Sequence, residues 1–453
     1  MTASEAPATA TPAARAATWG ETLAVYLQPR VLIVLFLGFS CGLPLALSGS
    51  TLLVWMRESG VDLGTIGLFA LVGTPYTIKF LWAPLIDALN VPLLSRALGR
   101  RRGWLVFSQL LLIAAILLLA LTDPARSPFY VALGALLVAT ASATQDTVVD
   151  AFRVESLPEN EQAAGMAVYV AAYRVGMLIS TAGALFLVSG FESTGIGKTA
   201  AWTWGYVAMA AMVGIGMIAS ILATEPERSR EVLEETKGED PATRVIDAAW
   251  GAFSEFLTRK DAWAVLAFVI LFKFTDAFSG TMTAPFVIDL GYTRNDYAAI
   301  VKGVGLAATL IGGFAGGFIA RAWSLPACLW FAGIIQALSN LVFAWLATID
   351  VNQWALAAAI TAENFTGAIG TVIFVAYLSA LCNNPLHTAT QYALLAALSA
   401  VGRTYLSASA GYVAQSTGWP LFFAVSVLVA IPSLLLLAWL QRRDHFTMLT
   451  AKV

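Results

Sequence analysis

Long apolar runs separated by short polar stretches dominate the chain. Most of the runs hold about 20 residues or more, the length that an α-helix needs to cross the hydrocarbon core of a bilayer. Twelve such runs lie at about 31–56, 63–87, 103–122, 128–152, 163–190, 200–223, 261–289, 294–320, 324–348, 353–382, 387–414 and 418–441. The pattern therefore predicts an all-α membrane protein with twelve transmembrane helices.

One long polar stretch, at 224–260, interrupts this pattern after the sixth run. It is rich in charged residues, which is typical of a linker between two membrane bundles. The first 18 residues are small and almost uncharged, and they lack the basic start and apolar core of a signal peptide. The predicted organisation is a disordered N-terminal tail (1–27), an N-terminal six-helix bundle (28–223), a cytoplasmic linker (224–260), a C-terminal six-helix bundle (261–441) and a cytoplasmic tail (442–453).

Composition supports the membrane assignment and excludes several other classes. Hydrophobic residues make up 58% of the chain and charged residues 12%, about half the charged fraction of a soluble domain. The 26 Lys and Arg against 28 Asp and Glu give no basic surface for nucleic acid. The three cysteines fall within apolar runs and the two histidines lie far apart, so neither a disulfide framework nor a metal site is expected.

The distribution of Lys and Arg predicts the orientation in the membrane. Seventeen of them fall in the segments on the side of the N-terminus and the linker. Because cytoplasmic loops carry the excess of basic residues, both termini are predicted to be cytoplasmic. Four lie on the opposite side, and these are Arg57, Arg126, Lys198 and Arg294.

The loop between the second and third spans resembles a known signature. Asp87 closes one helix and a basic cluster, Arg100 to Arg102, opens the next. This arrangement in a protein of two six-helix halves resembles the major facilitator superfamily, whose halves rock about a site between them. The resemblance implies a gating role for Asp87 and Arg101. The inserted segment NVPLLSRAL departs from the signature, and a simple positive-inside anchor is the alternative.

Catalytic machinery is absent from the sequence patterns. There is no G-x-S-x-G, no H-E-x-x-H and no Cys/His pairing. The segment GIGKT (195–199) resembles the end of a phosphate-binding loop, but the glycine that should begin that loop is replaced by Glu192. We therefore expect no enzyme activity and no cofactor.

Charged residues inside the spans are the strongest functional signal. Each costs of order 2.5 to 3.5 kcal/mol on insertion, so each needs a partner or a wet cavity. The deep cations are Lys79, Arg174, Lys273, Lys302 and Arg403, and the deep acids are Asp146, Asp276 and Glu363. The excess of cations predicts an anionic cargo held by these cations, and the acids are the candidates for proton coupling, with Glu363 preferred. Lys273 and Asp276 are three residues apart and could instead neutralise each other.

Asp150 and Arg153 lie nearer the cytoplasmic end of the fourth span. Their spacing predicts a salt bridge, and we expect it to act as a gate. Asp146 lies one turn deeper on the same helix face.

Aromatic and amide side chains accompany the deep charges. An aromatic face beside an amide or a cation suits a carbohydrate or another flat, partly polar ligand, although most aromatic residues in such a chain pack or face lipid. These candidates for the binding site are Tyr76, Gln145, Tyr173, Asn364, Gln391 and Tyr392.

Several longer segments resemble one family, the AmpG-type muropeptide permeases. They include KFLWAPLIDAL (79–89), ATQDTVVDAF (143–152), AAYRVGML (171–178), LFKFTDAF (271–278), AENFTGAIGT (362–371) and ATQYALLAALSAVGR (389–403). The resemblance runs from about residue 28 to 441. It implies proton-driven import of GlcNAc-anhydromuramyl peptides across the bacterial inner membrane, for peptidoglycan recycling and signalling to β-lactamase induction. Many members continue beyond a twelfth span, and the twelve-span core is expected to suffice for transport.

Two other functions stay open. One is transport of another anionic metabolite, such as an acetyl-CoA-like molecule or a nucleotide-linked sugar, on the same fold. The other is a transporter-like sensor, against which the lack of a soluble output domain counts. The expected partners are the small-molecule cargo, protons and the lipid bilayer, and we expect a monomer.

Overall fold

The computed structural model describes residues 25–226, 258, 261–381 and 388–450. Residues 1–24 of the predicted N-terminal tail and most of the predicted linker lie outside these residues. The described part of the chain is helical and contains no strand. In it, ten helical stretches are long and apolar enough to cross a membrane.

The N-terminal half follows the predicted order of spans. Its elements are α2 (Pro29–Ala46), η1 (Leu47–Thr51) and α3 (Leu52–Glu58) in the first span; α4 (Leu63–Leu68), η2 (Phe69–Gly73), α5 (Thr74–Ile78), η3 (Lys79–Leu81) and α6 (Ala83–Ala88) in the second; α7 (Leu94–Leu98) in the loop; then α8 (Arg100–Ala120), α9 (Pro128–Ser156), α10 (Glu159–Leu178), η4 (Ile179–Gly183), α11 (Ala184–Ser193) and α12 (Lys198–Leu222).

The C-terminal half repeats this plan. Its elements are α15 (Ala262–Gly280) and α16 (Thr283–Asp289) in the seventh span; α17 (Arg294–Asp296), η5 (Tyr297–Val304) and α18 (Gly305–Ala322) in the eighth; α19 (Leu325–Leu346) and α20 (Gln353–Leu381); α21 (Thr388–Val401), η6 (Gly402–Leu406), η7 (Ser407–Ser409) and α22 (Ala410–Thr417) in the eleventh; and α23 (Trp419–Leu428) with α24 (Ile431–Arg442) in the twelfth. The predicted C-terminal tail carries a further short helix, α25 (His445–Thr450).

Two of the twelve predicted spans differ from continuous helices. The segments 63–87 and 387–414 are each divided into short helices joined by tighter or wider turns. In the first of them Pro75 and Pro84 stand at helix starts, where a missing N–H and a fixed φ favour a new helix over continuation of the old one. The ten remaining predicted spans are found as long apolar stretches.

Within the described residues, wide π-helical turns interrupt four spans, the first, fifth, eighth and eleventh. Such turns are frequent at functional sites. Those of the first and fifth spans are tied together, because the Thr51 hydroxyl donates to the Ser180 carbonyl at 2.8 Å. The turn η1 also contains Gly49 in a non-helical conformation, three residues after the helix has passed Ala46.

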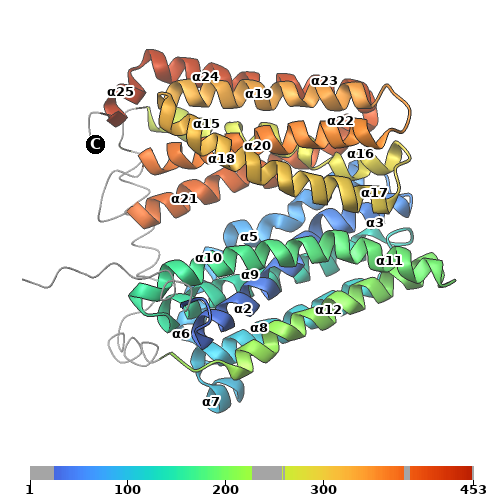
Figure 1. The fold of residues 1–453 in the computed structure, drawn as a ribbon, viewed down its shortest axis with the longest axis vertical. Helices are drawn as coiled ribbons and strands as arrows, with labels where there is room; N and C mark the ends of the chain where they lie inside the picture. The colour runs from blue at the N-terminus through green and yellow to red at the C-terminus, as the bar shows by residue number, and fades with distance from the viewer. Residues whose placement is uncertain (1–24, 227–257, 259–260, 382–387, 451–453) are drawn as a thin grey trace, which may run out of the picture.

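Three apolar cores show how the two halves meet. One core is confined to the N-terminal half and another to the C-terminal half, and both lie toward the ends of α12 and α15 that border the linker. The third core joins both halves at the opposite end. Figure 1 shows the two bundles diverging on one side and meeting where α3, α11, α16 and α17 gather. We call the two sides the linker end, which is open, and the closed end.

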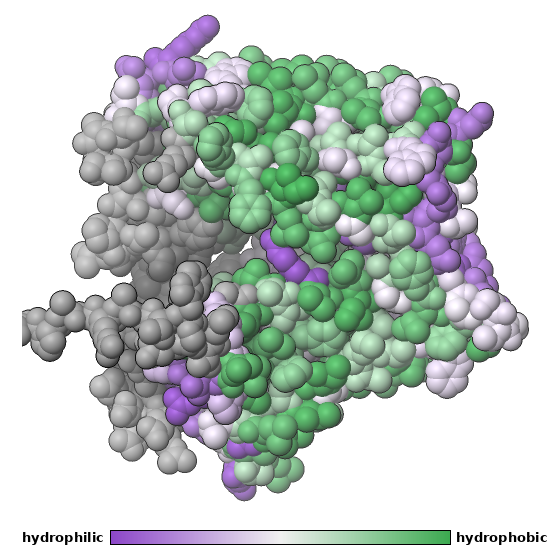
Figure 2. Space-filling model, in the orientation of Figure 1, coloured by the Kyte–Doolittle hydropathy of each residue, from purple (hydrophilic) through white to green (hydrophobic). Residues whose placement is uncertain are grey.

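The surface in view fits a membrane environment. In Figure 2 a broad apolar band covers both halves, with polar residues gathered at the closed end and near the linker end, and the surface is hollowed between the halves. An apolar band of this kind is what a bilayer requires of a spanning protein.

Candidate functional site

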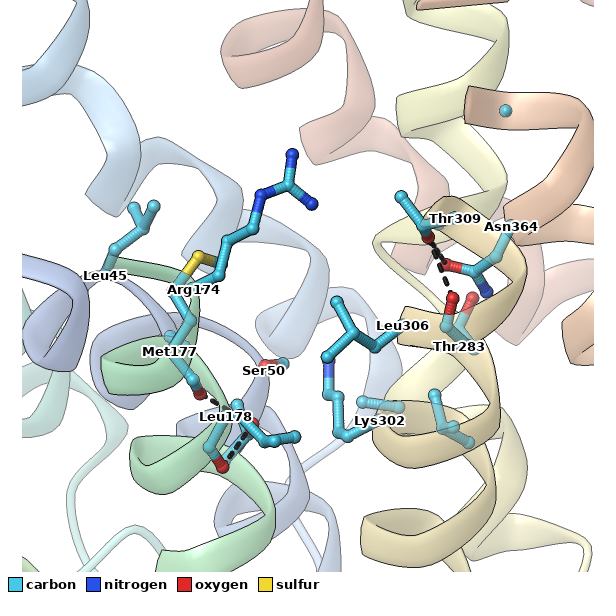
Figure 3. Close-up of a pocket in the computed structure, with 18 of the residues that line it drawn as sticks. Leu45, Ser50, Arg174, Met177, Leu178, Thr283, Lys302, Leu306, Thr309 and Asn364 are labelled. Carbon is cyan, nitrogen blue, oxygen red and sulfur yellow. Dashed lines mark hydrogen bonds between the residues drawn. The ribbon is translucent and has the colours of Figure 1, made fainter. Parts of the chain in front are cut away.

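A cavity of about 1280 Å³ lies between the two halves. Six spans line it, the first, second and fifth from the N-terminal half and the seventh, eighth and tenth from the C-terminal half. Figure 3 shows its two walls facing each other. This volume exceeds the roughly 300–1,000 Å³ typical of pockets for small ligands, so the cavity suits a large cargo.

The cavity brings together half of the residues that the sequence analysis proposed for binding and coupling. The predicted residues in its wall are Tyr76, Tyr173, Arg174, Asp276, Lys302, Glu363 and Asn364. They come from both halves, so a cargo that touches all of them must bridge the halves.

Arg174 dominates the N-terminal wall. It lies on α10 with an exposed side chain, and it makes no hydrogen bond or ion pair with another residue in the described part of the chain. Figure 3 shows it extending from its helix into the space between the halves. The neighbouring Tyr173 ring packs at 6.0 Å against the ring of Tyr169, which fixes an aromatic surface beside the guanidinium. This wall therefore offers an uncompensated cation next to aromatic faces.

The C-terminal wall carries a second cation and a carboxylate. The Lys302 ammonium, from η5, lies 5.3 Å from the centre of the Tyr297 ring and forms no ion pair with a described residue. Asn364 accepts from the Thr309 hydroxyl at 3.3 Å, and Glu363 accepts from the Thr283 hydroxyl at 3.3 Å. Arg174 and Lys302 thus face the same cavity from opposite halves (Figure 3).

Lys273 and Asp276 satisfy each other. The Lys273 ammonium donates to the Asp276 carboxylate at 3.1 Å and to the Thr371 hydroxyl at 3.0 Å. The pair ties α15 to α20 within the C-terminal half, which matches the alternative that the sequence left open for it. Asp276 lines the cavity, whereas Lys273 does not.

A second polar cluster lies inside the N-terminal half, away from the cavity wall. Asp146 is 7% exposed, and one of its carboxylate oxygens has no hydrogen-bond partner among the described residues. It lies within electrostatic reach of Lys79 and Asp150. Gln145 is fully buried and donates to Ser40 at 3.1 Å, so in this conformation it joins α9 to α2. Neither Gln145 nor Lys79 lines the cavity.

The remaining predicted binding residues belong to the eleventh span. Arg403 lies in η6 with an exposed side chain and is absent from the cavity lining. Gln391 and Tyr392 lie on α21, but their side chains fall outside the described part of the structure, as does that of Asp87.

The predicted gating pair Asp150 and Arg153, and a contact of the predicted gating residue Arg101 with Glu155, lie within the N-terminal half. Asp150 and Arg153 are 3.9 Å apart on the same helix, α9. Arg101 binds the Glu155 carboxylate, with 3.0 Å between Nε and Oε2, and so joins α8 to α9. Both pairs lie at the linker end, where the halves diverge, and neither of these contacts bridges the halves.

Ion pairs that do bridge the halves lie at the closed end, and the sequence analysis does not identify them. Arg57, at the end of α3, donates to Asp289, at the end of α16, with 2.8 Å between Nη2 and Oδ2. Arg294 binds Glu58 at 2.8 Å and Glu192 at 3.0 Å. From the sequence, these cations count only as outer-loop charges. Glu58, next to Arg57, is a further charge at the end of the first span and could have been noted as a candidate for an ion pair. The sequence alone does not show which distant residue it binds.

Comparison with known proteins agrees with this architecture. The model of the Major Facilitator Superfamily matches residues 34–404. The anhydromuropeptide permease of Escherichia coli (strain K12) is 39% identical over 428 residues, which cover 94% of this chain and 83% of that protein. A relative in Rickettsia felis is 35% identical over 92% of this chain and 98% of its own length.

Solved structures share the fold at low sequence identity. A mutant of the nucleoside transporter NupG matches with a TM-score of 0.69 and 12% identity over 93% of this chain and 99% of its own. A D-xylose-proton symporter matches with a TM-score of 0.64 and 12% identity over 90% and 97%. The chain therefore belongs to the Major Facilitator Superfamily and, within it, to the family of the anhydromuropeptide permease.

Proposed function

We propose that the protein imports anhydromuropeptides across the bacterial inner membrane in symport with protons. The observation that carries this proposal is the cavity between the halves, in which Arg174 and Lys302 lie on opposite walls without ion-pair partners among the described residues. A cargo of sugars joined to a peptide supplies carboxylates for these cations and flat apolar faces for Tyr76 and Tyr173. The name of the Escherichia coli relative supports the same cargo.

The orientation predicted from the basic residues assigns a direction to the two ends. With the linker in the cytoplasm, the open end faces the cytoplasm and the closed end faces the periplasm. The conformation described here is then the inward-open state of an alternating-access cycle. The gating role proposed from the sequence would then belong to the state in which the linker end is closed. The residues concerned are Asp87, Arg101, Asp150 and Arg153.

The proposal is tested by uptake of a labelled anhydromuropeptide into right-side-out and inverted membrane vesicles, with and without an imposed pH gradient. Accumulation should occur in right-side-out vesicles and increase when the outside is acidic. A competing acetyl-CoA-like or nucleotide-linked compound should not reduce uptake. Strong competition by such a compound, with no uptake of the muropeptide, would favour the alternative anionic cargo.

The binding residues are tested by substitution. In Arg174→Gln and Lys302→Gln we expect cargo affinity to fall by about 1.5–3 kcal/mol, the range for hydrogen bonds to charged groups. Arg126→Gln is the matched control, because the Arg126 side chain is 87% exposed and pairs only with the nearby Asp123 among the described residues. Unchanged affinity in both cavity variants would exclude Arg174 and Lys302 as the binding site for an anionic group, although the protein could still be a transporter.

A further inference from the structure

Arg294 binds two acids of the opposite half at the closed end. It is the first residue of α17, and its side chain is 9% exposed. The guanidinium holds Glu58 from α3 and Glu192 from α11, and Lys198 lies 3.8 Å from the same Glu58 carboxylate. Breaking this partly buried ion pair would leave the charges without these partners, which costs free energy. The contact therefore favours the closed state of this end.

An aromatic stack lies directly beneath Arg294. The guanidinium carbon is 5.1 Å from the centre of the Trp202 ring, which is a cation–π distance. The Trp202 ring stacks on that of Trp55 at 5.5 Å and 15°, and Tyr206 tilts against Trp55 at 5.1 Å. Trp202 and Tyr206 are 0% and 1% exposed, so the stack has no room to shift without disturbing its neighbours.

The stack ends at the backbone of η1, which borders the cavity between the halves. The Tyr206 hydroxyl donates to the Leu47 carbonyl at 3.1 Å. Leu47 begins the π-helical turn η1, and the next three residues, Ser48, Gly49 and Ser50, line the cavity. The bond ties the first residue of η1 to α12, and so it stabilises η1 in its kinked form.

We propose that Tyr206 and Trp202 are positioning residues that couple η1, beside the cavity, to the ion pairs of Arg294 with Glu58 and Glu192. We call these ion pairs the Arg294 gate. The kinked form of η1 places Tyr206, Tyr206 supports Trp202, and Trp202 supports the guanidinium that binds Glu58 and Glu192. Cargo that contacts Ser48 to Ser50 then alters the stability of the gate through this chain of contacts. This last consequence rests on the proposed function, whereas the mechanical connection does not.

The gate is tested without cargo, by the accessibility of a reporter cysteine. Thr281→Cys places a thiol in the cavity wall. Cys41 and Cys328 are fully buried, and Cys382→Ser removes the third cysteine. A membrane-impermeant maleimide should label the reporter rapidly in the vesicle orientation that exposes the linker end and slowly in the other. In Arg294→Gln the slow rate should rise at least about tenfold, because Glu192 loses the cation that binds it from the other half and Glu58 keeps only Lys198 of its own half. An unchanged slow rate would overturn the claim that the ion pairs of Arg294 keep this end closed.

The mechanical connection is tested by combining variants. Tyr206→Phe keeps the ring but removes the hydrogen bond to the Leu47 carbonyl, so the slow rate should rise about five- to tenfold. If the two residues act through one contact chain, Tyr206→Phe combined with Arg294→Gln should label no faster than Arg294→Gln alone. Rates that multiply in the double variant would overturn the proposal.

Two controls separate coupling from a general loosening of the fold. Tyr130→Phe removes a hydroxyl from a side chain that is 63% exposed, and its labelling rate should match that of the parent. Arg57→Gln breaks the other bridging pair, so its effect should multiply with that of Tyr206→Phe. All these rates are independent of cargo identity, so failure of this inference is distinguishable from failure of the proposed muropeptide transport.

Discussion

Glu363 lies in the cavity wall with a hydroxyl as its hydrogen-bond partner and no ion-pair partner among the described residues. Its Oε1 accepts from Thr283, whereas Asp276 is already held by Lys273. A proton carrier has to exchange its proton as the site opens and closes, so it needs access to the cavity and freedom from a permanent cation. Of the three acids predicted for coupling, Glu363 meets both conditions best.

We therefore expect Glu363→Gln to separate exchange from accumulation. Exchange of labelled for unlabelled cargo at equal pH should survive, because the amide still accepts from Thr283. Accumulation driven by a pH gradient should vanish, because an amide neither takes up nor releases a proton near neutral pH. Both are measured in the same vesicles. If accumulation persists in Glu363→Gln and is lost instead in Asp146→Asn, the buried cluster of the fourth span carries the proton.

The residue scale also shows where sequence reasoning ends. Charges inside the spans could be recognised because the surrounding residues are apolar, and seven of the proposed binding and coupling residues do line the cavity. The partners of a charge were harder to predict. Lys273 and Asp276 are three residues apart and could be paired in advance, whereas Arg294 and Glu58 are separated by 236 positions along the chain. Only folding decides such distant pairs.

At the scale of elements, the broken second and eleventh spans cross at the closed end. A Cβ atom added at Gly411, in α22, would collide with the Leu63 carbonyl oxygen, in α4. Gly64 also makes a bond across the halves, donating its backbone N–H to the Gln415 side chain at 3.1 Å. The two helices approach this closely because a glycine of each, Gly67 in α4 and Gly411 in α22, lies at the crossing. The apolar runs predicted the two spans but not their breaks, since proline and glycine are tolerated in membrane helices.

Gly411→Ala should therefore weaken closure of that end. The added methyl group has no space against the backbone of α4, so the halves must separate and the labelling rate of the Thr281→Cys reporter through the closed end should rise. Gly214→Ala is the matched control, because a Cβ atom there meets nothing within 4 Å. Equal rates in the two variants would show that this crossing does not limit closure.

The short helix α25 gives a prediction about pH. His445 is buried, and its Nε2 lies 3.2 Å from the Tyr377 hydroxyl of α20. Burial lowers the pKa of His445 below its usual value, and the charge of Asp261 opposes this shift to a smaller extent. The folded state therefore favours the neutral ring. The contribution of the buried neutral ring to the free energy of unfolding is complete above about pH 6.5, the pKa of His in the unfolded chain. It is lost as the pH falls from there toward the lower pKa of the folded state.

Thermal unfolding of the purified protein at different pH values tests whether the His445 contact stabilises the protein more at high pH than at low pH. The difference in stability between the wild type and His445→Gln should be larger at pH 8 than at pH 5.5. Tyr377→Phe removes the same contact from the other side and should show the same loss at pH 8. A difference that grows as the pH falls would mean that the ring is charged in the folded state.

At the scale of the whole molecule, two halves with one shared core and two separate cores explain why the structure is open at one end. The spans and their division into halves follow from the apolar pattern and the polar linker. The conformation does not follow from that pattern, because a single sequence supports both the open and the closed arrangement of each end. What selects the arrangement is the set of contacts that cross the halves, and the shared apolar core and the bridging ion pairs described above lie at the closed end.

The Arg57–Asp289 pair tests this view directly, because each partner belongs to a different half. Arg57→Asp alone places two acids together and should speed labelling of the Thr281→Cys reporter through the closed end. Asp289→Arg alone should do the same with two cations. The double variant restores opposite charges and should recover much of the slow rate, although Trp419 loses its 3.0 Å bond to Asp289. The double variant is measured beside Trp419→Phe, which accounts for that lost bond. If the double variant labels as fast as the single variants, the Arg57–Asp289 pair does not hold the halves together, and the other contacts at this end close it.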